Sequence, residues 1–161
     1  MTGIYPIGPA DQAKVLALNN QFAVETSLLD APKLAAMVKE AFLATRIGDV
    51  DAFLIVFDQH ARYDSPNFVW FRDRFPDFVY VDRIVTGPQA RGKGYARALY
   101  GDLFTKAVVA GHRRVVCEVN QDPPNPVSDA FHATLGFAEV GHQALQGTSK
   151  TVRYLSKNIP S

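Results

Sequence analysis

Two glycines flanked by basic residues are the clearest candidate for ligand chemistry in this sequence. In the segment RGKGYA, residues 91–96, Gly92 and Gly94 precede a stretch with helical periodicity. Because glycine lacks Cβ, it adopts unusual backbone dihedral angles and lets an anion approach the main chain closely. An anion at the start of a helix meets free backbone N–H groups and the positive end of the helix dipole. The segment therefore predicts a pyrophosphate site, with positive charge at its rim from Arg91, Lys93 and Arg97.

The same residues also fit a plainer alternative, in which a helix begins after a glycine-containing turn and the basic side chains are solvated. Other phosphate-binding motifs fit less well. The segment lacks the third glycine of GxGxxG, and the chain has no GxxxxGK[ST] motif. The turn also lies in the middle of the chain instead of after a first strand. A Rossmann-type dinucleotide fold and a P-loop enzyme are therefore disfavoured.

The elements on either side of this turn must hold it in place. Residues 78–86, FVYVDRIVT, have the β-branched and aromatic content of a strand, and residues 114–120, RVVCEVN, predict the next one. Between them lies an amphipathic helix that Gly111 would end. Its buried face is predicted by Ala96, Leu99, Leu103 and Ala107. Strand, glycine-rich turn, helix and strand together are typical of a parallel crossover.

The N-terminal half predicts two helices and a hairpin. A short strand at residues 4–7 is followed by a helix that begins near Pro9. Asp30 would cap a second helix. The buried face of this helix would carry Leu34, Met37, Val38, Ala41 and Phe42. Residues 44–47 and 52–57 then predict two strands joined by a tight turn.

The C-terminal part predicts a short helix and two more strands. Ser128 would cap the helix, which would end at Gly136. Two strands follow, at about residues 137–145 and 150–156. Together, these elements predict one α/β or α+β domain whose sheet contains both parallel and antiparallel strands. Residues 58–77 mix polar and aromatic side chains and match no element clearly.

Bulk properties exclude several classes of protein. With 161 residues, 47% hydrophobic and 20% charged, the chain has the size and composition of one folded domain spanning residues 1–161. Its formal charge of +1 gives no general attraction to nucleic acid or to anionic membranes. The single cysteine, Cys117, lies in an apolar run, which predicts burial and excludes an intrachain disulfide framework. We expect a cytoplasmic protein, because neither a signal peptide nor a membrane helix is evident.

Two motifs in the second half of the chain resemble those of the GNAT N-acetyltransferases. The family motif [RQ]xxGx[GA] is matched by Arg91, Gly94 and Ala96, with Pro88 at the usual distance before it. A second family pattern has Asn, then Tyr seven residues later, then Gly-Phe. Its counterparts in this chain are Asn125, His132, Gly136 and Phe137. The motifs cover residues 78–140 in the family's order. More narrowly, the segments FVYVDRIV, CEVN, PPNP and FHATLGF resemble a branch of predicted acetyltransferases without an assigned substrate.

This resemblance implies the GNAT fold and its coenzyme. The fold has a central, mixed, largely antiparallel sheet of about six to seven strands, a V-shaped splay between the fourth and fifth strands, and about four flanking helices. The coenzyme would be acetyl-CoA, and no metal is expected. The strand at residues 84–86 would contact its acetyl and pantetheine groups, and residues 92–97 its pyrophosphate. The coenzyme-binding residues would be Ile84, Val85, Thr86, Arg91, Gly92, Lys93, Gly94, Tyr95, Ala96, Arg97, Asn125 and His132.

The resemblance also implies direct attack of an amine on the thioester in a ternary complex. Glu118 stands where some relatives carry the carboxylate that removes the amine proton, and Asp82 competes for this role. Strand alternation would put Asp82 on one face with Tyr80 and Ile84. Either carboxylate could instead pair with a neighbouring arginine, namely Arg83 or Arg114.

His132 replaces the tyrosine that commonly protonates the departing thiolate in this family. A histidine with an ordinary pKa near ~6.5 can protonate a thiolate whose pKa is near ~8.5. His132 could instead hydrogen-bond the coenzyme or pack within the short helix. The position of His132 in the motif is the only basis for the acid role.

The acceptor is expected to be a small molecule with a primary amine. Residues 58–77, the covering segment, could close over an acceptor. Candidate contacts from this segment and from the two central strands are Tyr63, Trp70, Phe71, Arg72, Arg83 and Asn120. The aromatic members also fit a hydrophobic cluster over the sheet edge. Asn19, Asn20 and Glu25 lie where relatives often bind acceptors. Protein amines, longer acyl groups and a binding module without turnover remain alternatives, and a homodimer is possible.

Overall fold

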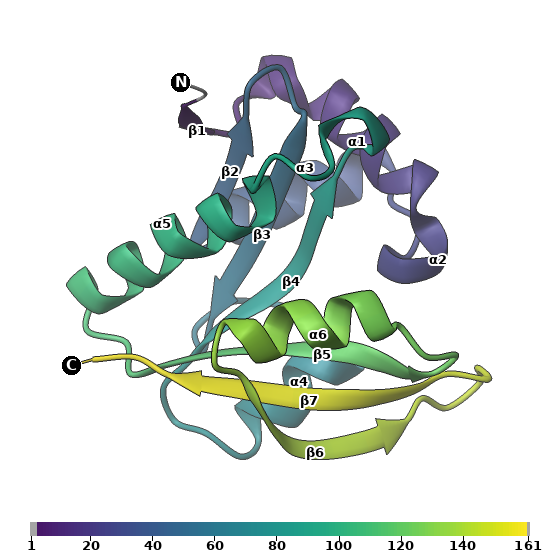
Figure 1. Cartoon of the computed structure of the whole chain (residues 1–161), viewed down its shortest axis with the longest axis vertical. Coiled ribbons are helices and arrows are strands. Elements are labelled where there is room, and N and C mark those ends of the chain that lie inside the picture. The colour runs from purple at the N-terminus through teal and green to yellow at the C-terminus, as the bar shows by residue number, and fades with distance from the viewer. Residues whose placement is uncertain (1–2, 161) are drawn as a thin grey trace.

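A computed structural model describes residues 3–160, without the side chains of Val24 and Glu25. Seven strands form one sheet in the order β1-β2-β3-β4-β5-β7-β6 (Figure 1). Only β4 and β5 pair in parallel; the other neighbours are antiparallel. The strands are β1 (Ile4–Pro6), β2 (Leu43–Ile47), β3 (Ala52–Asp58), β4 (Val79–Thr86), β5 (Arg114–Asp122), β6 (Ala138–Ala144) and β7 (Thr151–Asn158). This confirms the mixed, largely antiparallel sheet with a parallel crossover.

The helices lie on both faces of the sheet. They are α1 (Gln12–Gln21), α2 (Ala23–Thr26), α3 (Ala31–Glu40), α4 (Pro66–Arg72), α5 (Tyr95–Val109) and α6 (Pro126–Thr134), with 3-10 turns at Pro9–Asp11 and Pro88–Ala90. Figure 1 shows α5 and α6 on one face, and α1, α3 and α4 on the other. The described residues thus hold two α-helices more than the four expected, the single turn α2 and the helix α4.

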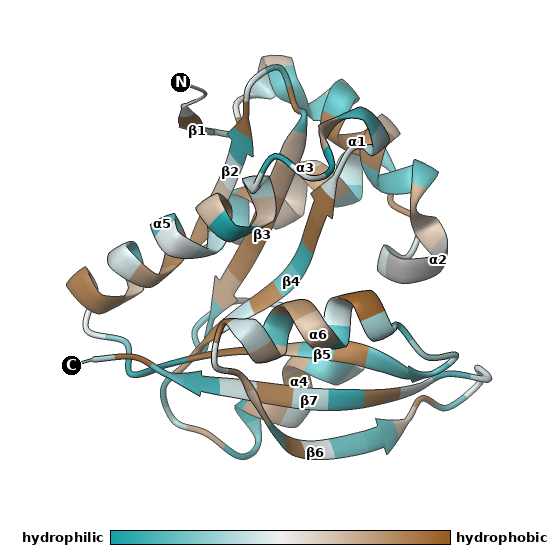
Figure 2. Ribbon diagram, viewed as in Figure 1, coloured by the Kyte–Doolittle hydropathy of each residue, from teal (hydrophilic) through white to brown (hydrophobic). Residues whose placement is uncertain are grey.

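Each face of the sheet has its own hydrophobic core. One core joins α1, α3 and α4 to the sheet, and the other joins α5 and α6 to it. Cys117 is buried in the second core, as its apolar surroundings predict. Figure 2 shows the apolar residues along β3 and the ends of β4, with a hydrophilic band halfway along β4. No helix within residues 3–160 is long and apolar enough to span a membrane.

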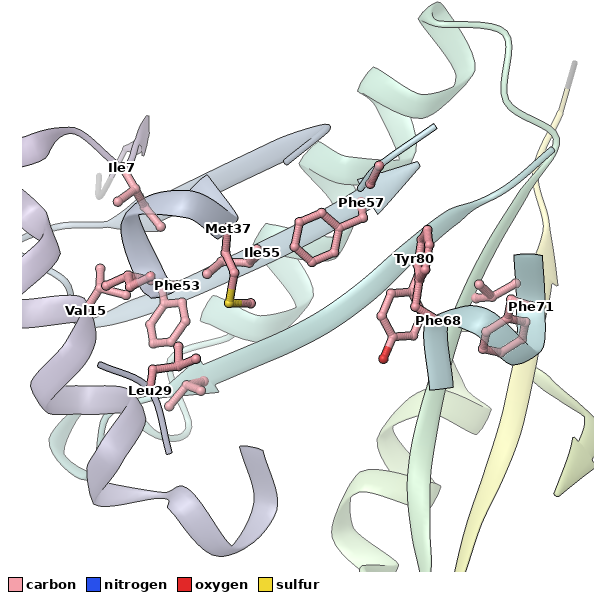
Figure 3. Packing of buried hydrophobic residues seen from close by; sticks show 14 of the residues in the cluster. Ile7, Val15, Leu29, Met37, Phe53, Ile55, Phe57, Phe68, Phe71 and Tyr80 are labelled. Atoms are coloured by element: carbon pink, nitrogen blue, oxygen red, sulfur yellow. The ribbon is translucent and has the colours of Figure 1, made fainter. Parts of the chain in front are cut away.

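The helix α4 was not predicted from the sequence. Pro66 suits a first helical turn, and Phe68 and Phe71, three residues apart, are both completely buried. Their rings lie 5.7 and 5.8 Å from the ring of Tyr80 on β4 (Figure 3). Seven residues are too short a segment for helical periodicity to be read with certainty. Burial of these aromatic side chains against the sheet fixes α4 beneath β4 and β5.

A β-bulge at Asp82 changes which residues share a face of β4. Ile55 pairs with Arg83 and Val56 with Val81, so Asp82 has no partner across β3. The extra residue reverses the alternation beyond it. Tyr80 therefore belongs to the core beneath α3 and α4, while Ile84 packs on the opposite face. The prediction that Tyr80, Asp82 and Ile84 share one face was wrong for Ile84.

Two helix boundaries also differ from the predictions. Asn125, not Ser128, caps α6, because the Asn125 side chain accepts a hydrogen bond from the Ser128 backbone N–H at 3.2 Å. α3 ends at Glu40, since Ala41 has extended backbone dihedral angles, so Ala41 and Phe42 lie beyond it. The cap at Asp30, the hairpin of β2 and β3 and the end of α5 before Gly111 are confirmed.

Candidate active site

The site is created where β4 and β5 separate. These strands pair at only two positions, Val79 with Val115 and Tyr80 with Val116, and then diverge (Figure 1). Beyond these pairs, among the described strands, β4 is paired only with β3 and β5 only with β7. The backbone N–H and C=O groups of the two inner edges are therefore available to a ligand. A cavity of about 320 Å³ lies in this opening, and its walls include Asp82, Arg83, Ile84, Cys117, Glu118, Asn120, Asn125 and His132.

The predicted phosphate turn has the required backbone. Gly92 and Gly94 have φ angles of +79° and +77°, which other residues rarely adopt. Open space surrounds both glycines, because a Cβ at either position would meet no atom within 4 Å. Gly94 precedes the first turn of α5, whose leading N–H groups have no intrahelical acceptor. Arg91, Lys93 and Arg97 are exposed around it. This cradle fits the diphosphate of a coenzyme.

Glu118 lies in the cavity with its two carboxyl oxygens in different surroundings. Oε1 accepts hydrogen bonds of 3.0 Å from the Tyr80 hydroxyl and from Nδ2 of Asn67. Oε2 is buried and has no hydrogen-bond partner among the described residues. Burial, with the nearby charge of Asp82, raises the pKa of Glu118 to about 8, although the two donors act in the opposite direction. Glu118 is therefore a half-buried residue of the cavity wall whose buried Oε2 has no described hydrogen-bond partner.

Asp82 differs from Glu118 in that both of its oxygens are occupied. Oδ1 accepts a hydrogen bond of 2.7 Å from the Tyr63 hydroxyl, and Oδ2 lies 2.6 Å from Nε of Arg83. The side chains of Asp82 and Arg83 are each only 4% exposed. Arg83 also donates to Oδ1 of the buried Asn19 at 2.9 Å. Asp82 and Arg83 thus form a buried ion pair on β4, and Arg83 connects this pair to Asn19 of α1.

His132 is buried, and both of its ring nitrogens are engaged. Nδ1 lies 2.8 Å from the Ser128 carbonyl oxygen, and Nε2 lies 2.7 Å from the Tyr100 hydroxyl. Burial lowers the pKa of His132, while the Ser128 carbonyl partly opposes this change. Tyr100 is fully buried on α5, and burial raises its pKa far above the ordinary value. The two side chains form a neutral pair at one wall of the cavity.

The structure divides the predicted acceptor residues into two groups. Tyr63, Arg83 and Asn120 line the cavity, whereas Trp70, Phe71 and Arg72 do not. Trp70 stacks on Tyr154 of β7 with a centroid distance of 4.2 Å, and Phe71 is completely buried. Arg72 is exposed, with its guanidinium 5.9 Å from the ring of Phe68. These three side chains belong to the packing of α4.

The polar residues between α1 and α3 have mainly structural contacts. Asn19 donates to the carbonyl of Ser27, and Asn20 exchanges two hydrogen bonds with the backbone of Leu29. These bonds shape the connection that brings Thr26 and Ser27 to the cavity wall. The side chain of Glu25 lies outside the described part of the structure.

Four residues around the site were not identified from the sequence: Asn67, Tyr80, Tyr100 and Tyr154. Asn67 is 51 positions from Glu118 and 87 from Tyr154, yet it contacts both. No motif links residues at such separations, and Tyr80, Tyr100 and Tyr154 occupy positions that would read equally well as core. Among the side chains that the structure describes, which leave out Glu25, no group of three or more His, Cys, Asp or Glu residues is arranged to hold a metal ion.

Comparison with known proteins identifies the class. The family model "Acetyltransferase (GNAT) family" matches residues 46–137, more than half of the chain, so this protein belongs to the GNAT acetyltransferase family. Among curated proteins, no sequence matches it significantly.

Solved structures share the fold at low sequence identity. The ribosomal-protein-S18-alanine N-acetyltransferase from Escherichia coli is similar with a TM-score of 0.75 and 16% identity, over 100% of this chain and 96% of that one. Arabidopsis thaliana NAA60 in complex with acetyl-CoA is similar with a TM-score of 0.77 and 14% identity, over 99% of both chains. An acetyltransferase of the GNAT family from Streptococcus pneumoniae gives 0.74 and 18%, over 99% of this chain and 100% of that one.

Proposed function

We propose that the protein is an acetyl-CoA-dependent N-acetyltransferase that acetylates a primary amine of a small molecule by direct attack in a ternary complex. One observation carries the proposal. Glu118 lines the cavity between two separating strands, and its buried Oε2 has no hydrogen-bond partner among the described residues. The same β4–α5–β5 unit carries a positive-φ glycine turn suited to a diphosphate. Family membership supports this combination.

The residues present fit acetyl-CoA. The turn at Gly92–Gly94 and the first N–H groups of α5 would hold the diphosphate, with charge from Arg91, Lys93 and Arg97. The free inner edge of β4 at residues 84–86 would bind the pantetheine amides and the thioester oxygen through backbone groups. Asn125 and His132 line the opposite side of the opening. When bound, the coenzyme supplies the thioester carbonyl that the amine attacks.

Glu118 is the proposed base. Oε2 would receive the proton of the attacking amine, directly or through one water molecule. A pKa of about 8 leaves roughly a tenth of Glu118 ionised at pH 7 and about half at pH 8, which lies in the range where a general base is effective. Asp82, the competing candidate, already has both oxygens bonded to Tyr63 and Arg83. We therefore assign Asp82 the role of fixing the bulge of β4 in place.

The proposed proton source for the departing thiolate is the pair of His132 and Tyr100. His132 occupies the family's acid position, but its Nε2 accepts from the Tyr100 hydroxyl, so the proton that reaches the sulfur would come from the Tyr100 O–H bond, and the tyrosinate left beside His132 would regain a proton from solvent. A thiolate of ordinary pKa near ~8.5 is a moderate leaving group, so this contribution is smaller than that of the base.

The size of the cavity supports the proposed class of acceptor. Ser65, Pro66 and Asn67, at the start of α4, close one side of the opening and leave a space of about 320 Å³. This volume suits a small ligand held by a few polar groups. Arg83 and Asn120 are the polar contacts we propose for the acceptor.

The decisive assay measures free thiol released from acetyl-CoA on addition of a library of small amines. Wild-type protein should release thiol with at least one small amine, and Glu118→Gln should not. Release with N-terminal peptides but with no small amine would contradict the acceptor class. Coenzyme binding without release from any amine would instead indicate a binding module. Parallel reactions with propionyl-CoA and succinyl-CoA test the acyl group, and faster release from either than from acetyl-CoA would contradict acetyl transfer.

A further inference from the structure

Beyond the proposed base itself, the structure indicates how that base is held. We infer that Asn67 on α4 is a positioning residue: its amide, oriented by Tyr154 of β7, fixes Oε1 of Glu118 and leaves Oε2 as the oxygen that takes the amine proton. This inference rests on the proposed function. It assigns a role to a helix in the segment whose fold the sequence did not predict.

The first step is the saturation of Oε1. A carboxyl oxygen has two lone pairs, and Oε1 of Glu118 accepts from both Tyr80 and Asn67 at 3.0 Å. Asn67 uses its Nδ2 group, which can only donate. When Glu118 is neutral, its proton therefore resides on Oε2, which has no described hydrogen-bond partner. The same oxygen must release a proton before catalysis and accept one during it.

The second step is the orientation of the Asn67 amide. Its Oδ1 accepts a hydrogen bond of 2.8 Å from the Tyr154 hydroxyl. Rotation of the amide by 180° would break this bond and would turn Oδ1 toward Oε1 of Glu118, so that two acceptor oxygens would face each other. The Tyr154 hydroxyl as donor and Oε1 as acceptor together keep the donor end of Asn67 directed at the carboxyl. Tyr154 is itself held by stacking on Trp70 of α4, with a centroid distance of 4.2 Å.

The third step is the rigidity of α4, the helix that carries Asn67. α4 is anchored by Phe68 and Phe71, both completely buried against the sheet. Asn67 lies one position before Phe68, and its side chain bridges β5 and β7 through Glu118 and Tyr154. These three residues come from three separate elements, so the position of the base depends on the docking of α4.

Hydrogen bonds to the ionised form favour ionisation, so loss of the Asn67 donor should raise the pKa of Glu118. A hydrogen bond to a charged group shifts a pKa by about one unit. For Asn67→Ala, kcat/KM at pH 7 should then fall about tenfold, because the ionised fraction falls about tenfold. The ratio of variant to wild-type kcat/KM should rise toward one as the pH passes the new pKa. A purely structural defect would lower this ratio equally at every pH.

The test measures the Glu118 pKa independently of activity, by NMR titration of the ¹³C-labelled carboxyl carbon in the free protein. Glu118→Gln identifies the resonance by removing it. The pKa should rise by about one unit in Asn67→Ala and by less in Tyr154→Phe, which keeps the stacked ring and loses only the hydroxyl. Arg72→Ala, an exposed change on the same helix, is the matched control and should leave the pKa unchanged.

An unchanged Glu118 pKa in folded Asn67→Ala would overturn the positioning role while leaving the proposed base intact. If Asn67→Ala does not fold, the titration of Tyr154→Phe takes its place. An unchanged Glu118 pKa in that variant would likewise overturn the positioning role. A ratio of kcat/KM that is independent of pH would also overturn the inference. Full activity of Glu118→Gln would overturn the base, and with it any catalytic meaning of Asn67.

Discussion

The hydroxyl of Tyr100 lies 2.7 Å from Nε2 of His132, on the side of the ring opposite to the Ser128 carbonyl. A carbonyl oxygen only accepts hydrogen bonds, so Nδ1 carries the proton of the neutral ring. Nε2 is then unprotonated, and its lone pair accepts a hydrogen bond from the Tyr100 hydroxyl. The residue at the family's acid position is therefore a hydrogen-bond acceptor toward a second, more deeply buried side chain.

This geometry predicts that His132 and Tyr100 act together. His132→Ala should lower kcat more than it weakens coenzyme affinity, by roughly 10²-fold at most, the lower end for general acid catalysis. Tyr100→Phe keeps the ring and should give a similar loss. Steady-state kinetics and calorimetric titration of the coenzyme measure the two effects. Full turnover in either variant would remove that residue from the proton path.

The pKa of Glu118 predicts how the reaction depends on pH. A base must be ionised to act, and the pKa of Glu118 in the free protein is about 8. The value of kcat/KM should therefore rise about tenfold per pH unit below 8 and level off above it, after correction for ionisation of the acceptor amine. Asp82→Asn removes a charge that raises the pKa of Glu118, so its midpoint should move to lower pH, but the rise of kcat/KM with pH should remain because Asp82 has no free oxygen to act as the base. A midpoint near the ordinary carboxylate pKa would contradict burial of the base.

Glu118 should also make stability depend on pH. Its pKa is about 8 in the folded protein, against an ordinary value of 4.5 in an unfolded chain, so the folded state binds more protons between these limits. The free energy of unfolding should therefore fall as the pH rises from about 4.5 to about 8, by a few kcal/mol. Glu118→Gln cannot ionise and should lack this contribution. Urea unfolding of both proteins across this range measures the difference, and parallel curves would contradict it.

The sequence predicted the elements around the phosphate turn because local rules determine them. Gly92 and Gly94 are required by positive φ angles, Asp30 caps α3 through its own side chain, and the parallel crossover follows from strand, turn and helix in order. Such signals depend on residues close together in the chain.

The surroundings of the base could not be predicted in this way. Tyr80, Asn67 and Tyr154 reach Glu118 from distant parts of the chain, and only the packing of α4 brings them together. The bulge at Asp82 has no local signature either, since register depends on the partner strand. Aromatic residues of the covering segment resembled a ligand wall, but the core needs those side chains to hold α4.

Gly94, just before α5, and Gly101, within α5, allow a matched test of the phosphate turn. Gly94 has a φ of +77°, whereas Gly101 is an exposed position inside the helix. Gly94→Ala should lower the free energy of unfolding by about 1–2 kcal/mol, because alanine is strained at this dihedral angle. It should also weaken coenzyme A binding roughly tenfold, since the strained turn no longer presents its N–H groups to the diphosphate.

Gly101→Ala should instead raise the free energy of unfolding by about 0.5–1 kcal/mol, because alanine favours a helix interior and a Cβ there meets no atom within 4 Å. Its coenzyme affinity should equal that of the wild type. Thermal unfolding and calorimetric titration of both variants separate helix stability from anion binding. Equal coenzyme affinities for the two variants would show that the diphosphate lies elsewhere, because only Gly94 shapes the start of α5.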